Sequence, residues 1–351
     1  MAPENKERIE TANTGAYSSN KWKLSYHIDE YGNAVIDRYY GNADKVELPS
    51  HIEGFPVAEI GFRAFWDGEA ITEITLPETL ICIGPSAFSG CTCLKEITIP
   101  RNTREIGAEA FCGCEDLVRV FLPEGLKTVG NGAFWHCDEI QGFVLPESLC
   151  YAGERAFAND ILTSIRFPAS LVELDGNPVA GSEAIRKVEI AEGNPALKWH
   201  DGLLVNELNR TAILALPNDK KRSYHVPEGI ISIGSGAFSC CRYMTELKLP
   251  STLENIEESA FSGCSGLYEL IVPDNVSYIA PFAFSYCYNL TELWLPDSVR
   301  ELSLFELPSY LHVIGGRGTE LESFCTENGI PFICRDDEEG LKNINITIAF
   351  D

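Results

Sequence analysis

The stretch GPSAFSGCTCLKEITIP at 84–100 decides the fold. It contains an Ala-Phe pair, two cysteines one residue apart, and a segment that alternates between apolar and polar residues before a proline. The same order of residue types returns along most of the chain. The stretch is therefore interpreted as one turn of an internal repeat, and not as an isolated metal or redox motif.

The repeat is marked by a phenylalanine that follows an alanine at intervals of 23 residues, with one long interruption. The repeat phenylalanines are Phe65, Phe88, Phe111, Phe134, Phe157, Phe238, Phe261 and Phe284. A proline stands 12 residues after seven of these eight phenylalanines, and the residues before it alternate between apolar and polar side chains. This period of two predicts a short strand that buries one face.

Each repeat is thus expected to hold a strand that ends at a proline, a bend at the glycine of an LxxIG motif, and a helical or irregular return. One repeat buries about six apolar side chains at roughly 1.5–3 kcal/mol each, whereas ordering its residues costs on the order of 35 kcal/mol. A single repeat is therefore unstable, and stacking must supply shared hydrogen bonds and a continuous core. The sequence predicts a repeat solenoid with a curved parallel β-sheet.

The unit LxxIxIPxxLxxIGxxAFxxCxx resembles the BspA-type leucine-rich repeat of bacterial and some protist proteins. The segment at 26–65 is similar to the N-terminal segment of that family, and GGRGTELESFCTENGIPF at 315–332 resembles its C-terminal cap. The resemblance spans roughly residues 22–334. It implies a leucine-rich-repeat fold, and it associates the chain with surface adhesion, host-protein binding or other protein–protein contact.

The repeats are interrupted between Phe157 and Phe238, where a hairpin is expected with arms at 203–205 and 211–216. The end of the chain has an acidic run followed by an alternating segment, which is either a last edge strand or a tail that pairs with another chain. The predicted organisation is a disordered tail at 1–21, an N-terminal cap at 22–60, repeats at 61–310 with the hairpin insertion at 193–227, a C-terminal cap at 311–334 and the acidic tail at 335–351.

The formal net charge of −25 over 351 residues excludes several classes of partner. Duplex DNA is held mainly through Lys and Arg contacts to phosphate, so nucleic acid is not expected. The charge also disfavours an anionic membrane surface, and no apolar run is long enough to span a bilayer. The first 20 residues lack the apolar stretch of a signal peptide. The expected location is the cytoplasm if Met1 is the natural start, and the cell surface or the exterior if a leader was removed.

Thirteen cysteines are present, an odd number that favours a reducing compartment over a disulfide framework. Six of them stand three residues after a repeat phenylalanine, namely Cys91, Cys114, Cys137, Cys241, Cys264 and Cys287. Recurrence at one position predicts a small buried side chain under each bend. Neighbouring turns are expected ~4.8 Å apart, wider than the ~3.8 Å Cβ separation of a disulfide, and a straight column does not offer the tetrahedral ligands of zinc.

The other cysteines near these positions, Cys93, Cys112 and Cys240, receive the same structural interpretation because their spacing is not that of a zinc knuckle. Cys325 and Cys334 lie near the predicted C-terminal cap, and their roles stay open. The histidines are scattered, and the chain has no GxSxG motif, no P-loop and no dinucleotide-binding fingerprint. A non-enzymatic protein without a cofactor or a metal is expected.

Alternation also predicts which strand residues face solvent, because the second and fourth residues before each proline point to the open face of the sheet. The first half of the chain groups cationic and apolar residues there or beside it, namely Arg119, Phe121, Val144, Arg166, Arg186 and Lys187. A second, apolar strip consists of Tyr268, Ile271 and Trp294. Exposed Arg and apolar side chains that group on one face are typical of interaction hot spots.

Glutamates recur at the fourth position before the proline, as in Glu246, Glu269 and Glu292. They are either a solvated face or a docking surface for a basic partner. The leading hypothesis is a non-enzymatic leucine-rich-repeat module that binds a protein, of unknown identity, on the open sheet face. The alternatives are an exported surface adhesin or host-factor binder, and a glycan binder that uses Tyr268 and Trp294.

Overall fold

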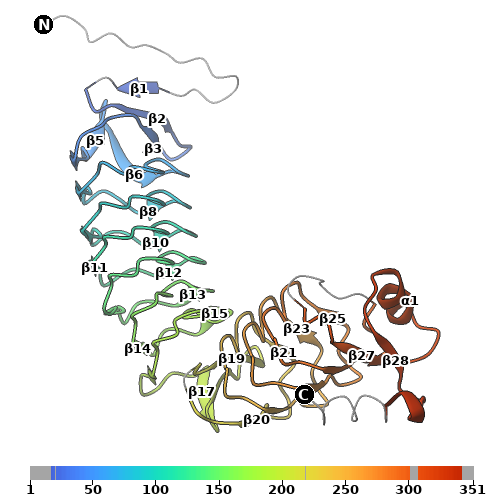
Figure 1. Cartoon of the computed structure of the whole chain (residues 1–351). Coiled ribbons are helices and arrows are strands. Elements are labelled where there is room, and N and C mark those ends of the chain that lie inside the picture. Colours follow the sequence, from blue (N-terminus) through green and yellow to red (C-terminus); the bar gives the residue numbers. More distant parts are fainter. Residues whose placement is uncertain (1–16, 20, 218, 301–306, 342–351) are drawn as a thin grey trace, which may run out of the picture. The chain divides into compact units, whose positions relative to one another are not determined.

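The computed structural model describes residues 17–19, 21–217, 219–300 and 307–341, and the chain divides into two compact units (Figure 1). Unit 1 extends to Pro195 and unit 2 begins at Ala196. In each unit, short strands from successive repeats stack in parallel, so the predicted solenoid of about 23-residue turns with parallel sheets is confirmed. Residues 1–16 of the tail expected to be disordered, and 342–351 of the acidic tail, lie outside the described residues.

Unit 1 opens with an antiparallel meander, although disorder is expected up to residue 21. The meander consists of β1 (Tyr17–Ser19), β2 (Leu24–Ile28) and β3 (Ala34–Tyr39). Strand β3 then pairs in parallel with β6 (Phe55–Ile60), which also pairs with the short β5 (His51–Ile52). The ladder continues with one strand per repeat, through β8 (Cys82–Ile83), β10 (Glu105–Ile106), β12 (Thr128–Val129), β13 (Tyr151–Gly153) and β15 (Glu173–Asp175).

The strands that precede the prolines form shorter parallel sheets on the other side of each turn. In unit 1 these are β4 (Lys45–Glu47) with β7 (Glu73–Thr75), β9 (Glu96–Thr98) with β11 (Arg119–Phe121), and β14 (Ser164–Phe167) with β16 (Lys187–Ile190). Residues 141–146 carry no strand, although the position of this segment before Pro146 predicts one. The returns between strands are irregular turns, not helices, within the described part of the repeats.

The LxxIG segment contains a short strand that the sequence does not predict, and the chain turns directly after it, at the glycine where a bend is expected. Its last residues form the longer of the two ladders, and its glycine lies against the preceding turn. A Cβ on Gly107 would lie 2.6 Å from the Pro85 nitrogen, and a Cβ on Gly130 would lie 2.5 Å from the Ala108 nitrogen. Neither glycine has a left-handed φ. Glycine is therefore required here by the close approach of successive backbones.

The repeat phenylalanines form a stacked column in the core of unit 1. The rings of Phe88 and Phe111 are 5.2 Å apart and nearly parallel, and Phe111 and Phe134 repeat that spacing with an interplanar angle of 1°. The cysteine three residues further on is fully buried, and its thiol donates to the carbonyl oxygen of the preceding phenylalanine of the column. For Cys114 and Phe88 this Sγ–O distance is 3.3 Å.

Unit 2 repeats the plan of unit 1, because it also begins with an antiparallel meander. The meander consists of β17 (Leu197–His200), β18 (Leu203–Asn206) and β19 (Thr211–Ala215), and the predicted hairpin arms are β18 and β19. Strand β19 pairs in parallel with β21 (Ser232–Ile233), which is followed by β23 (Asn255–Ile256) and β25 (Tyr278–Ile279). Leu203, Val205 and Ala212 are part of the unit 2 core, so the insertion caps the first turn of that unit.

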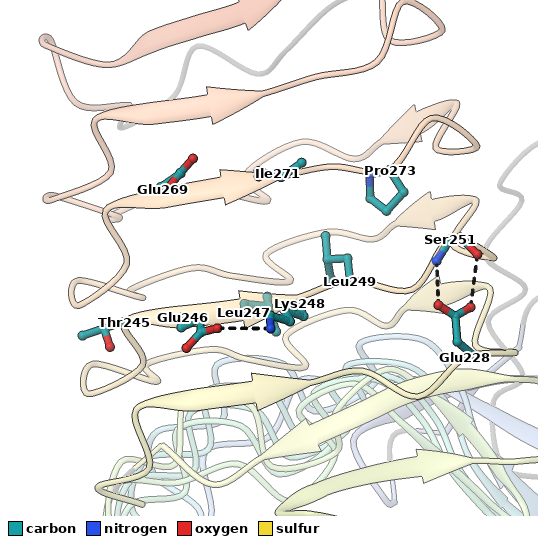
Figure 2. Close-up of a pocket in the computed structure, with 10 residues that line it drawn as sticks. All are labelled: Glu228, Thr245, Glu246, Leu247, Lys248, Leu249, Ser251, Glu269, Ile271 and Pro273. Carbon is teal, nitrogen blue, oxygen red and sulfur yellow. Dashed lines mark hydrogen bonds and ion pairs between the residues drawn. The ribbon is translucent and has the colours of Figure 1, made fainter. Parts of the chain in front are cut away.

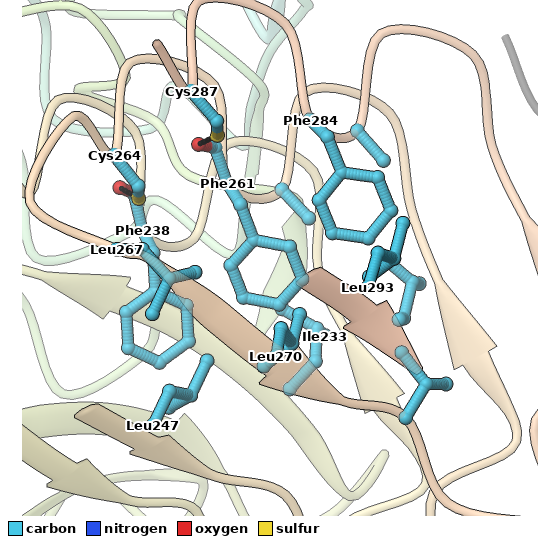
Figure 3. Packing of buried hydrophobic residues seen from close by; sticks show 14 of the residues in the cluster. Ile233, Phe238, Leu247, Phe261, Cys264, Leu267, Leu270, Phe284, Cys287 and Leu293 are labelled. Carbon is cyan, nitrogen blue, oxygen red and sulfur yellow. Dashed lines mark hydrogen bonds between the residues drawn. The ribbon is translucent and has the colours of Figure 1, made fainter. Parts of the chain in front are cut away.

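The second side of unit 2 carries the strands before the prolines. They are β20 (Ser223–His225) with β22 (Glu246–Lys248), and β24 (Glu269–Ile271) with β26 (Glu292–Trp294). Strands β27 (His312–Gly315) and β28 (Phe332–Cys334) extend the second of these sheets, although no proline follows them. Between the ladders, Phe238, Phe261 and Phe284 pack beside Cys264 and Cys287 (Figure 3). No helix among the described residues has the length and hydrophobicity to cross a bilayer.

Helix α1 (Glu320–Glu327) covers the last turns of the unit 2 core. The Thr319 side chain accepts a hydrogen bond from the Glu322 backbone N–H, which is a usual N-cap. Leu321 and Cys325 are the buried residues of the helix and belong to the core cluster. Cys325, whose role the sequence leaves open, is thus part of the apolar packing.

Candidate binding faces

The open face of unit 1 exposes two large apolar side chains on neighbouring turns. Phe121 lies on β11 with 52% of its surface exposed, and Val144 lies in the strandless stretch of the next turn with 88% exposed. An apolar side chain with that degree of exposure contributes little hydrophobic free energy to folding. The two side chains therefore form an apolar surface that is not buried by the fold.

The cationic residues of this face are paired with carboxylates, whereas the sequence suggests an excess of positive charge. Arg119 Nη2 lies 2.7 Å from Glu96 Oε2 on the neighbouring strand, and Arg166 Nη1 lies 2.6 Å from Glu147 Oε1. Lys187 pairs with Glu189 two residues along its own strand. Such exposed pairs contribute little stability, about 0–1 kcal/mol each. They leave a nearly neutral rim around the apolar pair.

Arg186 has a different role from the other cations. Its Nη1 donates to the carbonyl oxygens of Glu183 and Ala184, at 3.1 and 2.8 Å. These bonds hold the guanidinium against the return that precedes β16. The structure therefore brings Arg119, Phe121, Val144, Arg166 and Lys187 together on the turns of one face, and it places Arg186 at its edge.

The apolar strip predicted in unit 2 is contiguous but uneven. Ile271 is 60% exposed and lies in register with Trp294 on the next strand, and Trp294 is half-buried. Tyr268 precedes β24 directly and is exposed. Of these three residues, Ile271 also lines a groove for which the sequence gives no signal.

This groove lies on the open face of unit 2 and has a volume of about 570 Å³ (Figure 2). It extends over β22 and β24 and over the turns that follow them. The lining residues are Glu228, Thr245, Glu246, Leu247, Lys248, Leu249, Ser251, Glu269, Ile271 and Pro273. Alternation predicts that Glu246, Lys248 and Glu269 face outward, but the hollow itself depends on the turns after the prolines, which have no periodic signal.

The repeat thiols are shielded from reagents by burial. All thirteen cysteines are free, and the six repeat cysteines are buried. Burial raises the pKa of the Cys287 thiol to about 12, and burial with the nearby Glu59 carboxylate raises the pKa of Cys82 to about 12. The thiolate is the species that oxidises and binds metals, so little of it forms near neutral pH. Among the described residues, no group of three His, Cys, Asp or Glu side chains is placed to hold a metal ion.

Native-state alkylation is expected to separate the cysteines into two classes. The six repeat cysteines should stay unlabelled by iodoacetamide at pH 7.5, while the half-buried Cys93, Cys150 and Cys240 are labelled first. Mass spectrometry of tryptic peptides, before and after unfolding in guanidinium chloride, measures both classes. Fast labelling of Cys114 or Cys264 in the folded protein would contradict the buried column.

The sequence pattern described as "BspA type Leucine rich repeat region" matches residues 58–186 and 216–307, with six copies. These ranges cover more than half of the chain. The chain belongs to the BspA-type leucine-rich-repeat family. No curated protein matches it. In this BspA-type chain, both candidate faces include residues from the segment that precedes the proline of a repeat, and the groove of unit 2 adds residues from the turns.

Several solved structures of bacterial proteins share this fold. A leucine rich cell surface protein from Faecalibacterium prausnitzii A2-165 is 24% identical with a TM-score of 0.60, over 90% of this chain and 97% of that one. The pneumococcal vaccine antigen PcpA is 20% identical with a TM-score of 0.56, over 93% of this chain and 100% of that one. A leucine-rich repeat protein from Eubacterium ventriosum is 17% identical with a TM-score of 0.55, over 85% of this chain and 77% of that one. At these identities the likeness shows the fold alone.

Proposed function

We propose that this protein is a non-enzymatic binding module of a bacterial cell surface, and that it holds a protein partner on the open face of unit 1. The observation that carries the proposal is the exposed pair of Phe121 and Val144 on neighbouring turns. Protein interfaces combine an apolar centre with a polar rim, and the ion pairs of Arg119 and Arg166 supply that rim. A protein surface complements this arrangement better than a glycan, because the centre offers no hydrogen-bonding group.

Location at the surface is supported by two of the similar structures, which are named as a cell surface protein and as a vaccine antigen. The thirteen free cysteines suggest a reducing compartment from the sequence alone. Burial answers that objection for the six repeat cysteines, because a buried thiol resists oxidation outside the cell. Surface biotinylation of intact source bacteria tests this location. Labelling only after lysis would place the protein inside the cell.

The binding face is tested with a double variant of the whole chain and with a single variant as its control. Partners are captured from the extracellular fluid of the source bacterium's habitat, purified, and titrated by biolayer interferometry. Phe121→Ser combined with Val144→Ser is expected to weaken the interaction about 30-fold, as loss of a hot spot does. The control is Ile81→Ser, which removes another exposed apolar side chain of unit 1. Equal binding by the double variant and the wild type would show that the face is wrong.

A further inference from the structure

The groove of unit 2 has carboxylates at both ends and apolar side chains between them (Figure 2). Glu246 and Glu269 lie at the start of neighbouring strands, and Glu228 lies beyond the proline turn next to Ser251. Leu249, Ile271 and Pro273 form the part in between. From Glu246 to Ser251 the chain advances by five mostly extended residues, so the two carboxylate ends are about 16 Å apart.

The carboxylate at the far end is held in a fixed orientation. Glu228 Oε1 accepts a hydrogen bond from the Ser251 N–H, and Oε2 accepts one from the Ser251 hydroxyl, each at 3.2 Å. Both donors are neutral, so the negative charge of Glu228 is not cancelled. A charged group that is already oriented loses less entropy when it binds a cation.

Of the two carboxylates at the near end, Glu269 carries negative charge that the fold does not use. Glu246 lies 3.7 Å from the ammonium group of Lys248, which also lines the groove. Within the described part of the chain, Glu269 and Glu292 make no ion pair, although they lie directly opposite each other on paired strands. Burial and the neighbouring Glu269 together raise the pKa of the Glu292 carboxyl. Like charges in register destabilise a sheet, so folding gains nothing from this arrangement.

A lysine or arginine side chain suits such a surface, because its aliphatic stem covers apolar atoms while its cation reaches a carboxylate. Arginine in addition matches a carboxylate with two parallel hydrogen bonds. In an extended peptide, residues i and i+4 lie on one face about 13 Å apart, with residue i+2 between them. Two basic side chains in that spacing reach both ends of the groove, and an apolar side chain at i+2 lies over Ile271 and Leu249.

We propose that the unit 2 groove binds an extended segment of a partner protein with the pattern basic-x-apolar-x-basic. The groove is separate from the Phe121 and Val144 face of unit 1, so either site can exist without the other. The strong overall negative charge accelerates the approach of a cationic segment, and this attraction weakens with added salt.

The test is a fluorescence anisotropy titration of the full-length chain with the labelled peptide Gly-Arg-Ser-Leu-Ser-Arg-Gly. Two further peptides are matched to it, one with glutamates in place of the arginines and one with serine in place of the leucine. The wild-type protein is expected to bind the first peptide about tenfold more tightly than the serine peptide, and to bind the glutamate peptide not at all.

Three variants locate the binding. Glu269→Gln is expected to weaken binding of the Arg-Leu-Arg peptide about tenfold, because a charge-assisted hydrogen bond is lost. Glu115→Gln is the matched control, since this exposed carboxylate of unit 1 has the same charge and lies outside the groove. Ile271→Ser is expected to remove the preference for leucine over serine while leaving the salt dependence unchanged.

Several outcomes would overturn the proposal. Equal losses with Glu269→Gln and Glu115→Gln would mean that the net charge alone attracts the peptide. Displacement of the peptide by spermine at an equal or lower concentration would mean that the groove holds a small polycation. Loss of peptide binding in the Phe121→Ser and Val144→Ser variant would move the site to unit 1. Retained peptide binding in that variant, together with loss in Glu269→Gln, supports the groove independently of the proposed function.

Discussion

Replacing Phe111 by alanine is expected to destabilise the protein by about 3–5 kcal/mol, the usual cost of truncating a buried phenylalanine. The ring is fully buried and stacks on Phe88 and on Phe134 at 5.2 Å on each side. Its loss leaves a cavity in the middle of the column, where two neighbouring rings each lose a partner. The turns are held in place by their backbone hydrogen bonds, so the cavity cannot close by collapse.

Differential scanning calorimetry of the full-length chain measures this effect. A fall of the midpoint temperature by roughly 10 °C is expected for the transition that contains unit 1. The matched control is Phe121→Ala, which removes the same ring from the same repeat at an exposed position. The control should change stability by less than about 0.5 kcal/mol. Equal destabilisation by both variants would refute the stacked core.

Gly130→Ala is expected to destabilise the protein by about 3 kcal/mol, although it adds a single methyl group. The new Cβ would lie 2.5 Å from the Ala108 nitrogen and 2.7 Å from the Gly107 carbonyl carbon. Both are backbone atoms of the preceding turn, so no side chain can rotate away to relieve the overlap. The two turns must separate, and the ladder bond from the Gly130 N–H to the Ile106 carbonyl oxygen, 2.8 Å long, would be strained.

The matched control for this variant is Gly142→Ala in the next turn. Gly142 has no neighbouring atom within 4 Å of an added Cβ, and its φ is not left-handed. Alanine there should be neutral or slightly stabilising, because glycine gives the unfolded chain more freedom. Chemical denaturation with urea, followed by circular dichroism, compares the two variants. A neutral Gly130→Ala would mean that successive turns do not approach as closely as the structure indicates.

The repeat and its outward-facing strand could be predicted because both leave a periodic signal. The spacing from Phe88 to Phe111 predicts the solenoid, and the alternation before each proline predicts which residues are exposed, as at Phe121. The strand at Cys82–Ile83 could not be found in this way, since two residues are too short to show a period. Gly84, which follows this strand, is compatible both with a bend and with a close backbone contact. Only the position of the preceding turn shows that the close contact is present.

The missing strand at 141–146 has a physical cause that the pattern conceals. Gly142 weakens a strand because it has no side chain to pack. The inward position that holds Ile or Val in other repeats of unit 1 holds Phe143, whose ring packs against Phe134 and Phe157 at 5.4 and 5.1 Å. Val144 is exposed as the alternation predicts, although the strand that the alternation implies does not form there.

The charge of the unit 1 face was harder to predict than its exposed positions. Arg166 pairs with Glu147, which lies 19 residues earlier and just after a proline, outside the alternating positions. Counting only the strand residues therefore gives too high a positive charge for this face, because the turns contribute carboxylates to the same surface. The groove of unit 2 was missed for the same reason, since Glu228, Ser251 and Pro273 reach it from the turns.

The antiparallel meander that opens unit 2 bears on how the chain responds to force. Stretching a solenoid from its ends peels off one turn at a time, because each turn contacts only its neighbours, and every turn releases roughly 75 Å of chain. The meander of β17, β18 and β19 interrupts this turn-by-turn detachment, since its antiparallel strands must shear apart together. We therefore expect a chain pulled from its ends to lengthen in small steps as repeat turns detach, and to resist further extension while β17, β18 and β19 remain paired.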